Sequence, residues 1–215
     1  MKRVYKSKLA ICFIGVDGTG KTTHAKLLCE HLLDDGILSL YQHLFSKHSV
    51  QKDLLHGHNI INTLIEYMGI ITGLPTGNPI IDIFKITLRV FGIMLFSWIK
   101  FIHDKTKYTK NVIIYDRYFY DNLVIYASTF IRYSSLILTL ARLIPMPSIV
   151  FLLMANPLSI MKRRKELDIK KIVKMFYLYE RLGKLISAKI ICTDIADINI
   201  MHKIIYNQVR QYLIK

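Results

Sequence analysis

The sequence predicts an α/β protein in which a five-stranded parallel β-sheet carries helices on both faces. Three observations lead to this prediction. A glycine-rich loop lies between a short apolar run and a helical pattern near the N-terminus. Short apolar segments alternate with longer helical patterns along the rest of the chain, and no internal repeat or low-complexity stretch interrupts them. Alternating strands and helices form parallel sheets through right-handed crossovers, with ligands at the carboxyl ends of the strands.

The glycine-rich loop spans residues 15–22 and reads G-x-x-x-x-G-K-T, the phosphate-binding loop motif. It follows the apolar run 9–14 and precedes a helical pattern from Lys21, the context that a phosphate loop requires. Glycines let successive N–H groups turn toward phosphate oxygens, and the helix N-terminus adds partial positive charge. Lys21 would reach the β- and γ-phosphates, and Thr22 would bind Mg²⁺. The expected nucleotide-binding residues are Gly15, Asp17, Gly18, Thr19, Gly20, Lys21, Thr22 and Thr23.

The remaining elements follow from apolar runs and from 3.6-residue periodicity. We expect strands at residues 9–14, 37–43, 111–115, 148–153 and 189–193. We expect helices at residues 21–33, 80–103, 120–143, 172–187 and 197–214, and a short helix opened by Asn156-Pro157. Glycines and prolines break the stretch 44–79, within which residues 53–68 form a further helical pattern.

Composition narrows the class of protein. The 215 residues suit a single domain, 1–215, and 52% apolar content supplies a large core. The formal charge of +15 favours polyanionic partners, although no nucleic-acid recognition motif supports that class. The three cysteines lack metal-ligand spacing, so we expect a reducing, cytoplasmic setting. Neither 90–99 nor 143–161 makes a membrane span of about 20 apolar residues, and the N-terminus does not read as a signal peptide.

Two further charged segments are expected near the phosphate loop. The strand 111–115 ends in Asp116-Arg117, which places both charges at the carboxyl edge of the sheet. Asp116 would orient Mg²⁺ and Arg117 would bind a phosphate, or the two would form a strand-end ion pair. The cluster 162–165 could close over phosphates as part of a lid at 162–171, or form a solvated helix face.

Together these features resemble the thymidylate kinases, within the P-loop nucleoside monophosphate kinases. The resemblance rests on the loop 13–23 with its acidic residue, on Asp-Arg-Tyr at 116–118, on Arg-Arg at 163–164 and on Leu-Phe-Ser at 95–97. It implies the three-layer P-loop NTPase fold with a short lid, and an acceptor-binding region at about 44–103. It also implies transfer of the ATP γ-phosphoryl group to a nucleoside monophosphate, dTMP by preference.

The resemblance also assigns roles to individual residues. The ATP phosphates and Mg²⁺ would be held by the loop, with Thr22 and Asp116 as the metal-binding residues, and residues 192–197 would lie against adenine. The implied catalytic residues are Lys21, Arg117, Arg163, Arg164 and Asp17. The implied acceptor-binding residues are Asp17, Phe96, Lys100 and Arg117. For Phe96 the alternative is a plain core aromatic, and either lid arginine could act.

The sequence departs from the family on the acceptor side. The family's Arg-Glu-Pro segment is missing at 41–48, where Gln42, His43 or Lys47 could substitute. Lys100 stands where the family has Arg, and Asp121 where a small Ser is common. The acceptor could therefore be another nucleotide, a deoxynucleoside or another small molecule, or the chain could be an ATP-binding regulatory protein without turnover.

Two expectations concern packing. The apolar helix 80–102 could pair two copies in a homodimer, as is common in the family, or belong to the core. His24 follows the loop on the first helix and is expected to be an exposed histidine, with proximity to the nucleotide as the alternative.

Overall fold

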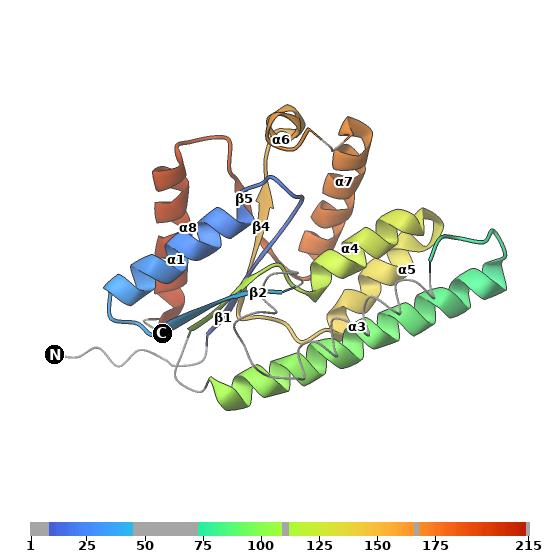
Figure 1. The fold of residues 1–215 in the computed structure, drawn as a ribbon, viewed down its shortest axis with the longest axis horizontal. Helices are drawn as coiled ribbons and strands as arrows, with labels where there is room; N and C mark the ends of the chain where they lie inside the picture. The colour runs from blue at the N-terminus through green and yellow to red at the C-terminus, as the bar shows by residue number, and fades with distance from the viewer. Residues whose placement is uncertain (1–8, 45–72, 109–111, 166–167, 214–215) are drawn as a thin grey trace.

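The computed structural model describes residues 9–44, 73–108, 112–165 and 168–213 (Figure 1). Its centre is a sheet of five parallel strands in the order β2-β3-β1-β4-β5. The strands are β1 (Ala10–Ile14), β2 (Ser39–His43), β3 (Val112–Asp116), β4 (Ile149–Met154) and β5 (Lys189–Cys192). The three central strands are almost entirely buried, as their uninterrupted apolar sequence predicts. The predicted fold class is confirmed.

Helices cover both faces of the sheet because successive strand residues point to opposite sides. Ile11 and Phe13 of β1 pack with α1 (Lys21–Asp34) and α8 (Ile198–Leu213). Cys12 and Ile14 pack with the helices of the other face. Those helices are α3 (Pro79–Lys107), α4 (Phe119–Thr129), α5 (Ser134–Thr139) and α7 (Ile169–Leu185). The result is the expected three-layer arrangement (Figure 1).

The single helix predicted at residues 120–143 is wrong. The structure ends α4 at Thr129 and continues through two 3₁₀ turns that flank α5, Ile131–Tyr133 and Leu140–Leu143. The chain bends by 120° between the two halves. Phe130 is 2% exposed and packs against Tyr126 at the bend, with ring centroids 4.8 Å apart. Burying this ring turns the chain, and a segment that is apolar all round gives no periodic signal of the turn.

Helix α3 is longer than predicted and has two different faces. It begins with Pro79 at its first turn, where the Asn78 side chain accepts from the Ile80 N–H at 3.0 Å, and it ends at Lys107. One face buries residues such as Val90 and Ile93 in the core. The opposite face carries apolar side chains that are exposed within the described part of the chain: Ile80, Ile81, Ile83, Phe84, Phe91, Leu95, Trp98, Ile99 and Ile102. The expectation that this helix belongs to the core is therefore met by one of its two faces.

The expected lid begins at the end of α6 (Pro157–Arg163), which starts with the Asn156 side chain accepting from the Leu158 N–H at 2.9 Å. Helix α7 begins at Ile169, earlier than predicted, so the first turn of α7 belongs to the range 162–171.

The predicted helix 53–68 and Lys47 lie outside the described residues. Among the described residues, no single helix is long and apolar enough to cross a membrane. The bent pair Phe119–Thr129 and Ile131–Leu143 meets the requirement when its two parts are taken together, by length and composition only.

Candidate active site

The phosphate loop connects β1 to α1 at the carboxyl edge of the sheet (Figure 1). Gly15, Gly18 and Gly20 have φ angles of 140°, 93° and 89°. These positive values favour glycine, since a Cβ would strain the backbone. At Gly15 the space is also closed, because a Cβ there would lie 2.4 Å from the carbonyl oxygen of Leu153 in β4. The sequence motif is therefore matched by the backbone geometry of a phosphate loop.

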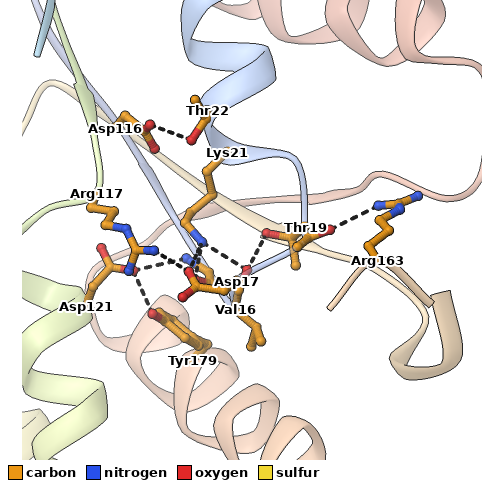
Figure 2. Close-up of polar contacts among 12 residues, drawn as sticks. Val16, Asp17, Thr19, Lys21, Thr22, Asp116, Arg117, Asp121, Arg163 and Tyr179 are labelled. Atoms are coloured by element: carbon orange, nitrogen blue, oxygen red, sulfur yellow. Dashed lines mark hydrogen bonds and ion pairs between the residues drawn. The ribbon is translucent and has the colours of Figure 1, made fainter. Parts of the chain in front are cut away.

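Lys21 occupies the middle of this loop and is 5% exposed. Its Nζ donates to the carbonyl oxygens of Gly15 at 2.8 Å and Val16 at 2.9 Å, and to Asp17 Oδ1 at 3.2 Å (Figure 2). Burial lowers the pKa of Lys21, while the carboxylates of Asp121 and Asp17 oppose that shift. The loop therefore holds a buried cation whose present partners are oxygen atoms, which phosphate oxygens can replace.

Arg117, the residue that follows β3, brings a second cation to the carboxylate that Lys21 contacts. Its Nη2 donates to Asp17 Oδ1 at 2.5 Å, so Asp17 bridges Lys21 and Arg117 (Figure 2). Burial works to raise the pKa of Asp17, but the two cations lower it overall. Arg117 has a φ of 72°, a left-handed conformation that costs a side-chain-bearing residue about 1–2 kcal/mol. Strain of this kind persists where the surroundings impose it, which is common at functional sites.

The two predicted Mg²⁺ ligands meet directly. Thr22 Oγ1 donates to Asp116 Oδ2 at 2.6 Å, and the Tyr41 hydroxyl donates to the same oxygen at 2.8 Å. The other carboxylate oxygen, Oδ1, is buried without a hydrogen-bond partner in the described structure. A hydroxyl next to a buried carboxylate is a fitting partial donor set for Mg²⁺, which binds proteins through one or two such groups plus water and phosphate oxygens. The described ranges hold no cluster of three or more His, Cys, Asp or Glu side chains suited to a metal.

The lid arginines lie over the loop. Arg163 donates to the Gly18 carbonyl at 3.0 Å and to Asp194 Oδ1 at 3.1 Å. A Cβ on Gly18 would come within 3.3 Å of Arg164 Cγ. Both arginines, at the C-terminal end of α6, therefore contact the loop, as a charge-neutralising lid requires.

These groups line one open cavity of about 520 Å³. Its phosphate end is formed by the loop, Arg117 and the two lid arginines, and its other end by Thr193, Ala196, Asp197 and Ile198. The latter residues overlap the segment 192–197 that the family resemblance places against adenine. The cavity thus has a cationic half and a less charged half, the division that a nucleoside polyphosphate needs. The lining residues are Asp17, Gly18, Thr19, Gly20, Lys21, Thr22, Thr23, His24, Arg117, Arg163, Arg164, Thr193, Ala196, Asp197 and Ile198.

Two buried residues beneath the loop were not predicted as part of the site. Asp121 is 1% exposed; its Oδ1 accepts from the Tyr179 hydroxyl at 2.6 Å and the Gly15 N–H at 3.4 Å. Its Oδ2 accepts from the Tyr118 N–H at 2.9 Å and so caps α4. Burial raises the pKa of Asp121 although Lys21 opposes the shift. The only signal in the sequence was an acidic residue three positions after Tyr118, the N-cap of α4.

The acceptor side is described in part. Lys100 Nζ donates to Asp104 Oδ1 at 2.7 Å and to Gln42 Oε1 at 2.8 Å, and both members of the ion pair are buried. Tyr115 donates to the other Asp104 oxygen at 2.5 Å. Phe96 is 8% exposed in the core cluster and does not line the 520 Å³ cavity. The roles predicted for Phe96 and Lys100 therefore stay predictions, and the charge of Lys100 is already balanced.

His24 is buried rather than exposed, so the favoured expectation for this residue is wrong. It is 3% exposed and lines the cavity next to the phosphate loop. The hydroxyl-rich start of α1 gave no sequence signal for this burial. The cause is tertiary: α8 packs on α1 and covers the ring.

Sequence comparisons do not place the chain: no protein-family model matches it, and no curated protein is significantly similar. Comparison of folds does find relatives. The structure of thymidylate kinase from Candida albicans is 16% identical with a TM-score of 0.63, covering 95% of this chain and 92% of that one. The structure of thymidylate kinase from Ehrlichia chaffeensis is 18% identical with a TM-score of 0.55, covering 95% and 99%. The chain therefore has the fold found in thymidylate kinases.

Proposed function

We propose that this chain is an ATP- and Mg²⁺-dependent kinase that transfers the γ-phosphoryl group to a nucleoside monophosphate, with dTMP as the favoured acceptor. The observation that carries the proposal is the meeting of Lys21, Arg117 and the lid arginines around one phosphate loop. A loop that only bound nucleotide would not need cations on three sides. The likeness in fold to thymidylate kinases, over nearly the whole chain, supports the same assignment.

The chain's own residues perform the expected tasks by position and charge. The loop amides and Lys21 hold the donor phosphates, and Thr22 and Asp116 provide oxygen ligands for Mg²⁺, which neutralises phosphate charge when bound. Arg117 and a lid arginine stabilise charge that develops on the transferred group. Asp17 holds the Arg117 guanidinium 2.5 Å from its carboxylate and so fixes the direction of that cation. Phosphoryl transfer needs little covalent chemistry beyond this alignment.

One observation favours an acceptor other than dTMP. Lys100, the expected phosphate ligand, is committed to Asp104 and Gln42. The Candida albicans neighbour is itself described as having broad substrate specificity. We therefore keep a related acceptor, another nucleoside monophosphate or a deoxynucleoside, as the second candidate.

An acceptor panel tests both candidates. ADP release from Mg²⁺-ATP would be measured with each nucleoside monophosphate and each deoxynucleoside in turn, beside an Arg117→Gln variant as the control. We expect release that depends on dTMP and falls at least 100-fold in the variant. Release with another acceptor alone would favour the second candidate. ATP binding with no acceptor-dependent release would instead indicate a regulatory nucleotide-binding protein.

A further inference from the structure

Asp121 is buried at a point where three parts of the molecule meet, and the proposed mechanism gives it no task. It lies in the first turn of α4 and is 1% exposed. Its Oδ1 accepts from the Gly15 N–H of the phosphate loop at 3.4 Å and from the Tyr179 hydroxyl of α7 at 2.6 Å (Figure 2). Its Oδ2 accepts from the Tyr118 N–H at 2.9 Å. Both carboxyl oxygens are therefore committed to groups from three different segments.

The contact with Tyr118 fixes the turn that carries Arg117. Tyr118 directly follows Arg117, whose φ of 72° is a conformation that the surroundings must impose. The bond from the Tyr118 N–H to Asp121 caps α4 immediately after this turn. The same carboxyl reaches Gly15, where the chain leaves β1 to form the loop. Asp121 therefore connects the Arg117 turn to the start of the phosphate loop.

Tyr179 adds the helix that follows the lid. The first turn of α7 belongs to the lid range 162–171, and Tyr179 lies further along the same helix. Its side chain is 2% exposed, and its hydroxyl donates to Asp121. A helix moves as a rod over such a length, so a bond at this position fixes the base of the lid relative to the loop.

A second cavity shows why these placements matter. It has a volume of about 180 Å³ and shares Asp17 and Arg117 with the donor cavity. Its other walls come from the start of the loop, from α4 and from α7, and include Gly15 and Tyr179. Phosphoryl transfer needs the attacking and leaving oxygens in line, so the residues common to both cavities mark where the two substrates would meet. Two of the groups that Asp121 holds, Gly15 and Tyr179, are walls of this cavity.

We propose that Asp121 and Tyr179 are positioning residues, which hold the Arg117 turn and α7 against the phosphate loop so that donor and acceptor are aligned for transfer. The inference rests on the proposed function, because it assigns both residues to the transfer step. A bound nucleotide meets the loop amides and Lys21, and the bonds from Lys21 to the loop carbonyls do not involve Asp121. Loss of the Asp121–Tyr179 bond therefore slows transfer and spares nucleotide binding.

Tyr179→Phe tests the inference, because it removes the hydroxyl and keeps the ring. Tyr118→Phe is the matched control: this side chain is also 2% exposed, and its hydroxyl donates to the Pro145 carbonyl at 2.8 Å. The control loses a comparable buried bond and keeps the backbone N–H that Asp121 accepts. Turnover would be measured with Mg²⁺-ATP and dTMP, or with the best acceptor of the panel. We expect kcat to fall about 10- to 100-fold in Tyr179→Phe and to change less than about threefold in Tyr118→Phe.

Two further measurements separate positioning from a general loss of stability. Urea unfolding is expected to show similar midpoints for the two phenylalanine variants, and calorimetric titration with ADP is expected to show affinities within about threefold of wild type. Asp121→Asn keeps one acceptor oxygen and replaces the other by an amide donor, so it breaks part of the same set of bonds. In Asp121→Asn/Tyr179→Phe we expect a smaller loss of kcat than the product of the two single losses, because both residues act through one contact.

The outcomes distinguish this inference from the proposed function. A kcat of Tyr179→Phe within threefold of wild type overturns the inference and leaves the kinase standing. Equal losses of kcat in Tyr179→Phe and Tyr118→Phe, a parallel loss of ADP affinity, or single losses that multiply in the double variant also overturn it. No transfer by wild type to any acceptor overturns the proposed function and this inference together.

Discussion

Replacing Gly15 by alanine tests whether the close approach of the phosphate loop to β4 is as tight as the structure shows. The substitution imposes a side chain on a φ of 140°, which costs about 1–3 kcal/mol. It also drives a Cβ to 2.4 Å from the backbone oxygen of Leu153, an overpacking that costs about 1–3 kcal/mol more. The expected loss is about 2–6 kcal/mol, a large share of the 5–15 kcal/mol that is typical of a domain.

Gly36→Ala is the matched control. Gly36 has a φ of 75° but no atom within 4 Å of a Cβ, so alanine there brings only the conformational cost of about 1–2 kcal/mol. Urea unfolding of both variants and wild type gives the two differences. The tight approach predicts a clearly larger loss for Gly15→Ala. Equal losses would show that β4 and the loop move apart freely, and would refute the reasoning.

Three further predictions concern neighbouring groups. Because Arg117 has a left-handed backbone that glycine adopts without strain, Arg117→Gly will unfold at a higher urea concentration than Arg117→Ala. The reverse order would show that the backbone at this position is not strained. Because burial raises the pKa of Asp121, its carboxyl favours folding at low pH and this contribution is lost as the pH rises through the folded-state pKa. The stability of wild type relative to Asp121→Asn will therefore fall from pH 4 toward neutrality in pH-dependent urea unfolding, and a constant difference would contradict this. Lys100→Met leaves Asp104 buried without its cation and will cost about 3–5 kcal/mol. Lys100→Met/Asp104→Asn removes the unpaired charge but keeps an acceptor oxygen for the Tyr115 hydroxyl, so it will recover part of this loss in the same measurement; no recovery would mean that the lost charge pair is not the cause.

The sequence predicts best the features that local rules determine. The loop 15–22 is recognisable because its glycines are required by its backbone, and the five strands are recognisable because buried parallel strands are apolar throughout. Asp116 and Arg117 could be placed beside the loop because the carboxyl ends of parallel strands meet at one edge of the sheet.

What the sequence could not predict depends on packing between distant segments. The break at Phe130 arises because a buried ring turns the chain, and an all-apolar segment hides it. Asp121 reaches the loop through Gly15 and Tyr179, which lie 106 and 58 positions away in the chain. The burial of His24 depends on α8, and the contact of Lys100 with Gln42 depends on β2. Residues such as these become interpretable only when the neighbouring elements are in place.

A homodimer formed through helix α3 is a separate proposal. The exposed apolar face of α3 within the described residues would supply the contact. Light scattering of the purified protein, with a Phe91→Asp variant as comparison, gives the mass directly. A dimer that the variant dissociates supports the proposal, and a monomeric wild type contradicts it.

Transfer of label from γ-³²P-ATP to dTMP, in wild type and in Lys21→Ala, tests the central claim most directly. Lys21 is the cation at the middle of the phosphate loop, and its removal leaves the loop carbonyls without their donor. We predict labelled dTDP, or another labelled nucleoside diphosphate if the acceptor is a different nucleoside monophosphate, at a rate that falls at least 100-fold in Lys21→Ala. Wild-type transfer rates in Lys21→Ala, or no transfer to any nucleotide by wild type, would contradict it.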